Sequence, residues 1–374
     1  VGSEMCIRDR LYYVPWRDAW NYRLGRYPMS VIQQDFGMTK DGHKASLYVL
    51  ENACGMRAAV SDFGALLVKL EVPDGTGKLR DVVLGYDSVQ EYEMSTSFFG
   101  ATVGPVANRT GNAAFTLHGK TYSLAVNDGK NNLHSDLGHG FHKRMWTAQP
   151  GENCVTFVLD SPDGDMGFPG NKHCAVTYVL TPENGLEIDY RVSSDADCPI
   201  NMTNHSYFNM MGQGQGTIES HKLQLDADYF TRADRESIPT GEIVPVAGTP
   251  MDFTTMRVVG DRIDTDYDQL NFAGGYDHNW VLNNYGTGVR KVATLEAPDG
   301  GLTMEVFTDL PGVQFYAGNA ITPHTGKNGV LYQKRFGLCL ETQFYPDSVN
   351  KPSFPSCIFG PDRPYETTTI FQFV

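Results

Sequence analysis

Apolar and polar residues alternate along most of the chain from Phe36 onward, which is the pattern of half-buried β-strands. Between residues 66 and 72 every second position is apolar, and Pro73-Asp-Gly75 then ends the run with turn-forming residues. Residues 115–124 repeat the pattern around His118-Gly-Lys120, which predicts a hairpin. Further strands are predicted at residues 155–159, 174–180, 186–192, 223–225, 303–307 and 369–373.

Helical signals are scarce in this sequence. Ser88-Val-Gln-Glu91 has the form of a capping box and predicts one short helix that ends by Met94. We find no long amphipathic stretch with the helical spacing of apolar residues. Because 39 glycines and 20 prolines separate many short strands, the predicted fold is all-β, a large β-sandwich with few short helices.

Residues 29–374 are predicted to form a single domain, because no shift in composition marks a linker. Residues 1–28 differ from the rest. Residues 11–27 are dense in Tyr, Trp and Arg without a clear period, and residues 1–10 lack the apolar region and cleavage site of a secretory signal. We expect this atypical leader to be extraneous, with Met29 as the natural start, and we assign it no function.

The composition argues against two classes of partner. Lysine and arginine number 30 against 44 acidic residues, a net charge of −14, and no basic run offers the footprint that nucleic acid requires. No segment is apolar over the ~18 residues that a membrane helix needs. The expected partner is therefore a neutral small molecule, bound by a soluble protein that is a monomer or a weak homodimer.

The cysteines indicate a reducing compartment. Seven are scattered along the chain without a C-x-x-C pair. Several lie within predicted strands, as small buried apolar side chains do. We therefore expect a cytoplasmic location.

The stretch from Asn201 to Asn209, Asn-Met-Thr-Asn-His-Ser-Tyr-Phe-Asn, concentrates groups that can hold a sugar. At its centre, His205 has a side chain that exchanges protons near neutral pH. Glu341 follows the apolar residues 336–340 and supplies a carboxylate. We predict that His205 and Glu341 face each other across one pocket, although a histidine in such a setting is more often a hydrogen-bonded structural residue.

Three further clusters offer polar groups for a ligand. Asn108 and Arg109 carry donors and an acceptor, but Arg109 could equally pair with an acid. Asp277 stands before an apolar strand, where it could accept bonds from two hydroxyls or serve only in a turn. Gln314 is placed to reach a ligand, whereas the aromatic residues beside it are typical of a core.

A loop with three histidines, at positions 134, 139 and 142, invites comparison with a metal site. The spacings do not match a known zinc pattern, and the surrounding glycines favour a loop over a rigid set of ligands. We therefore predict no metal and interpret His134 as a hydrogen-bonding residue of the pocket.

Taken together, these clusters resemble the aldose 1-epimerase family, the galactose mutarotases, from about residue 36 to residue 373. Eight motifs in the family's order carry the resemblance: Asn108-Arg109, Asn132-Leu-His134, Thr203-Asn-His-Ser-Tyr-Phe-Asn209, Ile238-Pro-Thr-Gly-Glu242, Thr249-Pro-Met-Asp-Phe253, Tyr276-Asp-His278, Pro311-Gly-Val-Gln-Phe-Tyr316 and Glu341-Thr-Gln343.

The resemblance implies a β-supersandwich that interconverts the α and β anomers of free hexoses without a cofactor. The family's proton donor falls on His205 and its base on Glu341. Its sugar-binding residues fall on Asn108, Arg109, His134, Tyr207, Asp277 and Gln314.

Two positions depart from the family's pattern. Pro105 stands where the family usually has an arginine, so that one donor is missing, and His142 stands where it usually has an aspartate. Because the second arginine of that motif, Arg109, is present, we expect the activity to survive.

Three alternatives remain open at the level of the sequence. An epimerase of phosphorylated hexoses would need more basic residues than this acidic chain shows. A glycoside hydrolase could use Asp277 and Glu341 as paired carboxylates. A non-catalytic sugar-binding or regulatory module on the same fold could keep the same site.

Overall fold

The computed structural model describes residues 30–374. The predicted leader, residues 1–28, and Met29 lie outside the described residues. Between residues 30 and 374, no helix has the length and apolar character needed to cross a membrane.

Three antiparallel sheets make up most of the fold. The largest has nine strands in the order β11 (Thr147–Pro150), β12 (Cys154–Ser161), β13 (Lys172–Leu180), β14 (Gly185–Ser194), β29 (Tyr365–Phe373), β23 (Thr303–Thr308), β22 (Arg290–Glu296), β17 (Lys222–Leu225) and β20 (Arg257–Val258). A second has five strands in chain order: β1 (Ser30–Met38), β2 (Lys44–Glu51), β3 (Arg57–Ser61), β4 (Leu66–Pro73) and β5 (Leu79–Asp81). The third, which carries most of the site, has the order β19 (Pro239–Pro245), β18 (Tyr229–Ala233), β21 (Asp277–Val281), β24 (Gly312–Tyr316) and β27 (Cys339–Gln343).

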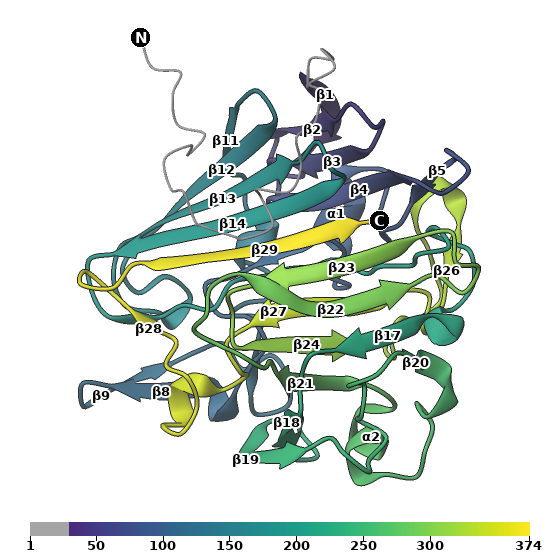
Figure 1. The fold of residues 1–374 in the computed structure, drawn as a ribbon. Coiled ribbons are helices and arrows are strands. Elements are labelled where there is room, and N and C mark those ends of the chain that lie inside the picture. Colours follow the sequence, from purple (N-terminus) through teal and green to yellow (C-terminus); the bar gives the residue numbers. More distant parts are fainter. Residues whose placement is uncertain (1–29) are drawn as a thin grey trace.

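Short strand pairs, two α-helices and several 3₁₀ turns complete the described part of the chain. The pairs are β6 (Ala101–Val103) with β16 (Thr203–His205), β7 (Arg109–Thr110) with β10 (Asn132–Leu133), β8 (Ala114–Leu117) with β9 (Lys120–Ser123), β15 (Cys198–Pro199) with β28 (Ile358–Phe359), and β25 (His324–Thr325) with β26 (Leu331–Tyr332). The helices are α1 (Val89–Met94) and α2 (Asp268–Ala273). In Figure 1 the nine-stranded sheet crosses the molecule, with β1 to β4 toward the top and β18 and β19 toward the bottom.

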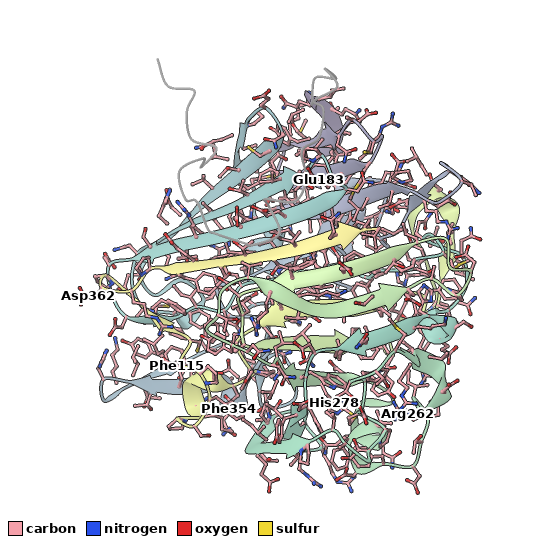
Figure 2. The ribbon with its side chains drawn as sticks, viewed as in Figure 1. Phe115, Glu183, Arg262, His278, Phe354 and Asp362 are labelled. Carbon is pink, nitrogen blue, oxygen red and sulfur yellow. The ribbon has the colours of Figure 1, made fainter. Side chains whose placement is uncertain are left out.

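The core forms because strands bury alternate side chains. Along β14, residues at even positions from Leu186 to Val192 are buried and those between them are partly exposed. One apolar cluster joins side chains from all three sheets, including Tyr48, Ile188 and Trp280. Side chains fill the space around the ribbon (Figure 2), and Phe115, labelled there on β8, is almost fully buried. The strands of different sheets are thus held by a shared core.

The all-β prediction is confirmed, and every segment predicted as a strand lies on an observed strand. The predicted capping box also forms, since the Ser88 N–H donates to Glu91 Oε2 at 3.0 Å and α1 ends at Met94. The six-residue helix α2 is missing from the prediction because it is too short to show a helical period. Its signals are local: Asp268 lies in the first turn, and Gly274 follows with a left-handed φ of 66°.

Gly100 fixes the strand pair that carries His205. Its φ is +64°, and a Cβ atom at this position would lie 1.9 Å from the Leu67 carbonyl oxygen. The close approach allows two hydrogen bonds, from the Leu67 N–H to the Gly100 carbonyl at 2.9 Å and from the Gly100 N–H to the His205 carbonyl at 3.1 Å. A glycine is therefore required where β4 meets the turn that leads into β6.

Candidate active site

One face of the sheet β21-β24-β27 is polar and the other is apolar. In the observed register Gln314 lies opposite both Asn279 and Glu341. Side chains of paired residues on neighbouring strands project from the same face of a sheet, and successive side chains along one strand alternate between the two faces. The polar face therefore presents Asp277, Asn279, Gln314, Glu341 and Gln343. The residues between them, such as Trp280 and Phe315, belong to the apolar core, so the same strands carry packing on one face and candidate chemistry on the other.

Strand β16 brings His205 to this polar face. It pairs with β6 so that His205 lies opposite Ala101. His205 Nε2 lies 3.5 Å from Glu341 Oε1. The residues are only 5% and 2% exposed. The structure thus places face to face the imidazole and the carboxylate that the sequence predicted to share a pocket.

Burial disfavours the charged form of both groups. Desolvation lowers the pKa of His205 to about 4, against opposing effects of a backbone hydrogen bond and of Asp277. Desolvation also raises the pKa of Glu341 well above its ordinary value, and the like charge of Asp277 adds to this while Arg109 opposes it. Low polarity therefore favours a neutral pair that shares one proton over an ionised Glu341 beside a protonated His205.

The second oxygen of Glu341 is available to a ligand. Glu341 Oε2 is buried and has no hydrogen-bond partner among residues 30–374. Buried carboxylate oxygens nearly always have a partner. A hydroxyl donor on a bound molecule would satisfy this oxygen.

Tyr207 and Cys339 contact the other sides of the His205 ring. The Tyr207 ring stacks on the imidazole with centroids 5.0 Å apart and an interplanar angle of 27°. Cys339 Sγ lies 3.5 Å from His205 Nδ1. These contacts direct Nε2, the nitrogen near Glu341, toward the pocket.

Asn108 and His134 are joined by two hydrogen bonds. The Asn108 N–H donates to His134 Nδ1 at 3.1 Å, and the His134 N–H donates to the Asn108 carbonyl at 3.0 Å. Both residues have left-handed φ values, 63° and 54°, which cost energy for residues other than glycine. Burial lowers the pKa of His134 well below its ordinary value, so the ring is neutral. Because Nδ1 accepts a hydrogen bond, the proton lies on Nε2, which is a donor.

The same hydrogen bond argues against a metal ion. His134, His205 and Glu341 bring three potential ligand atoms within 4.8 Å of one another. A neutral histidine that binds a metal through Nε2 must carry its proton on Nδ1, where His134 instead accepts the Asn108 N–H. The loop histidines form no alternative set, since the His139 side chain is 85% exposed beside Asp136 whereas His142 is buried. The cluster is suited to hydroxyl groups.

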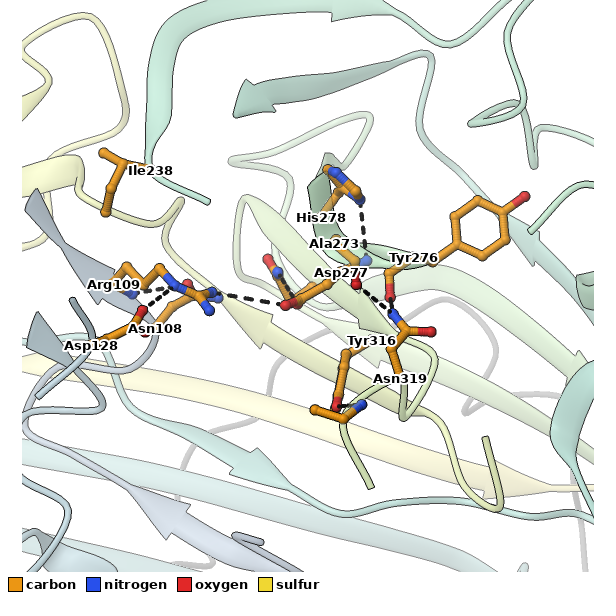
Figure 3. A network of polar contacts seen from close by, with 12 residues as sticks. Asn108, Arg109, Asp128, Ile238, Ala273, Tyr276, Asp277, His278, Tyr316 and Asn319 are labelled. Atoms are coloured by element: carbon orange, nitrogen blue, oxygen red, sulfur yellow. Dashed lines mark hydrogen bonds and ion pairs between the residues drawn. The ribbon is translucent and has the colours of Figure 1, made fainter. Parts of the chain in front are cut away.

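Arg109 connects the carboxylates of Asp128 and Asp277 (Figure 3). Its Nε donates to Asp128 Oδ2 at 2.7 Å, and its Nη1 lies 3.8 Å from Asp277 Oδ2. Gln314 Nε2 donates to the other oxygen of Asp277 at 2.7 Å. Arg109 therefore pairs with acids, which was one of the two interpretations of the sequence. It also lies at the pocket.

Gln343 is a part of the site that the sequence analysis did not assign. Its Oε1 accepts from Asn108 Nδ2 at 3.4 Å, and its Nε2 donates to Asn279 Oδ1 at 3.1 Å and to Gln314 Oε1 at 3.2 Å. The residue is fully buried. One carboxamide therefore orients several polar groups of the pocket, and its position two residues after Glu341 on one strand is the signal that could have identified it.

The structure brings all eight residues predicted from the sequence into one connected cluster: His205, Glu341, Asn108, Arg109, His134, Tyr207, Asp277 and Gln314. An acid–base pair surrounded by carboxamides, a guanidinium and a neutral imidazole donor suits a ligand rich in hydroxyls. Pro105 is one of the two positions that depart from the family's pattern. Its carbonyl accepts the Asn201 N–H at 2.8 Å.

Comparisons with known proteins agree with this chemistry. The family model described as aldose 1-epimerase matches residues 46–372. The chain is 41% identical to the galactose mutarotase of Bos taurus over 85% of this chain and 91% of that one. It is 37% identical to the aldose 1-epimerase of Escherichia coli K12 over 92% and 99%. A crystal structure of galactose 1-epimerase from Lactobacillus acidophilus superposes with a TM-score of 0.80 at 27% identity, over 92% of this chain and 99% of that one.

Replacing the buried carboxamide tests the proposed arrangement of the pocket. We expect Gln343→Leu to lower the free energy of unfolding by about 1–3 kcal/mol, because it leaves buried groups of Asn108 and Gln314 without partners. Urea unfolding measures this loss. The exposed Gln333→Leu is the control and should change stability by less than about 0.5 kcal/mol; equal effects of the two would refute the account of this network.

Proposed function

The chain belongs to the aldose 1-epimerase family, and we propose that the pocket around His205 and Glu341 is its active site. There the enzyme, an isomerase, interconverts the α and β anomers of free hexoses such as galactose and glucose. The observation that carries the assignment of the site is the buried contact of an acid–base pair with an unpartnered carboxylate oxygen.

The reaction needs two proton transfers at different atoms of the sugar. Glu341 removes the proton of the C1 hydroxyl, and His205 protonates the ring oxygen, so that the ring opens to the aldehyde. Rotation about the C1–C2 bond followed by reclosure, with the roles of the two residues reversed, gives the other anomer. Each proton transfer of this kind contributes about 10²–10⁴ in rate.

Substrate binding supplies the charge distribution that burial disfavours. Burial by itself favours a neutral arrangement of the one proton that the pair shares, because desolvation penalises both ions. A C1 hydroxyl that donates to Glu341 Oε2 stabilises the carboxylate, and a ring oxygen that accepts from His205 Nε2 stabilises the imidazolium. The sugar thereby shifts the shared proton to His205, which then donates it to the ring oxygen.

The surrounding residues bind and orient the sugar. His134 is a neutral donor through Nε2, and Arg109 offers charged donors, so both can stabilise charge that develops on an oxygen of the sugar. Asn108, Asp277 and Gln314 bind the more distant hydroxyls and fix the ring. Tyr207 contributes through the face of its ring beside His205. Orientation of this kind is a large part of catalysis by proximity.

We extend the proposal to the setting in which the enzyme acts. Its partner is a free monosaccharide, without nucleic acid or a membrane, and no cofactor takes part. We place it in the cytoplasm as a monomer or a weak homodimer. The net charge of −14 supports the exclusion of nucleic acid.

Polarimetry of freshly dissolved α-D-galactose and α-D-glucose tests the function. We expect the wild-type protein to accelerate the approach to the equilibrium rotation, and Glu341→Gln and His205→Asn each to lower the rate by at least about 10²-fold because each removes one proton transfer. The exposed His173→Asn, as control, should retain full activity. A wild-type protein that binds sugar but leaves the buffer rate unchanged would instead be a binding module.

The pH profile tests the electrostatics of the pair. The carboxylate of Asp277 raises the pKa of both Glu341 and His205, so its removal must lower both. We therefore expect kcat/KM to follow a bell-shaped profile, and Asp277→Asn to move both limbs to lower pH in addition to reducing the maximum. Asp128→Asn, which removes the other partner of Arg109, is the control. Limbs that stay in place or move to higher pH in Asp277→Asn would contradict this account.

A further inference from the structure

Phe98 lies against three buried histidines of the site. Its ring centroid is 4.7 Å from that of His134, 4.6 Å from that of His142 and 5.7 Å from that of His205. All three histidines are buried, whereas Phe98 is partly exposed. The phenyl ring therefore separates the three imidazoles from solvent.

The His205 ring is stacked against two aromatic rings. Phe98 lies at an interplanar angle of 25° to it, and Tyr207 lies at 27°. This arrangement fixes the plane of the imidazole and leaves its edges for Glu341 and Cys339, each 3.5 Å away.

The backbone at Phe98 is strained. Its φ is +58°, a left-handed conformation that is rare for a bulky residue. Strained residues of this kind persist only where their surroundings hold them, and they cluster at functional sites.

A neighbouring segment holds Phe98 in place. His142 and Lys143 belong to the short 3₁₀ turn Phe141–Lys143. The His142 ring packs on Phe98, and Lys143 Nζ donates to the carbonyls of Tyr92 and Ser95, each at 2.6 Å, at the end of α1. The turn thus anchors both Phe98 itself and the chain that leads to it. His142 is also one of the two departures noted in the sequence.

We propose that Phe98, supported by His142, is an aromatic cover that holds the His205 imidazole in plane and excludes water from the acid–base pair. It is a positioning element, which acts through His205. Its effect on turnover rests on the proposed function, whereas its effect on the His205 ring does not.

The titratable groups around His205 determine how its pKa should change when the cover is lost. Glu341, Cys339 and Asp277 act on the ring from the β21-β24-β27 sheet, and His134 and His142 from the loops. None of these changes in Phe98→Ala, so admission of water remains as the main effect, and water favours the protonated ring. In His142→Asn the stacking partner of Phe98 is lost without a new charge beside His205.

NMR titration of the full chain with labelled histidine tests the cover directly. The His205 signal is assigned by its loss in His205→Asn. We expect its pKa to rise toward the ordinary value in Phe98→Ala and in His142→Asn, and to stay at the wild-type value in Phe98→Tyr. Phe272→Ala, which removes another partly exposed phenylalanine, is the control. A His205 pKa that is the same in Phe98→Ala, His142→Asn and the control would overturn the proposal.

Polarimetry of the same variants separates the two proposals. With the cover removed we expect kcat to fall by about 10–100-fold, as misplacement of a catalytic group does, with a change in KM of less than about threefold and an acid limb at higher pH. Phe98→Tyr should restore the rate. If the wild type shows no mutarotation, the proposed function fails while the NMR titration still decides the cover. If Phe98→Ala does not fold, His142→Asn carries the test alone, because it removes only the support of Phe98 and adds no charge beside His205.

Discussion

The contact on which the site depends is that between His205 Nε2 and Glu341 Oε1, 3.5 Å apart and almost completely buried. Two ionisable groups in such surroundings are stable only because they can share one proton and remain neutral as a pair. The same desolvation makes them reactive when a sugar arrives, since an imidazolium with a lowered pKa is a stronger acid and a carboxylate with a raised pKa is a stronger base.

The sheet architecture is what makes this burial possible. Antiparallel pairing gives each strand two faces, so β21, β24 and β27 contribute Trp280 and Phe315 to the core and a row of polar groups to the pocket. Gln343 then connects those polar groups into one network. The sandwich therefore supplies a rigid platform, while the strained positions Asn108 and His134 lie on the loops that complete it.

Much of the fold could be predicted from the sequence because the signals are local. Period-two alternation predicted β4, β13 and β14, and the capping residues predicted α1. The residue types of the site, in particular His205 and Glu341, could also be named, because proton transfer needs those groups and their motifs resemble a known family.

What the sequence did not predict depends on distant contacts. The roles of Gln343 and Phe98 follow from neighbours that lie far away in the chain. The protonation of the pair follows from burial, which no local pattern reports, and the proton position on His134 follows from one backbone hydrogen bond. These features appear only when the strands and loops are assembled.

A crystal structure of the Glu341→Gln variant with bound α-D-galactose would show whether residues 205 and 341 reach the reacting atoms of the sugar. We predict that the C1 hydroxyl oxygen lies about 2.6–3.2 Å from the side chain at position 341, and the ring oxygen at the same distance from His205 Nε2. A sugar bound with its C1 and ring oxygen away from these two residues, or bound outside the pocket, would contradict it.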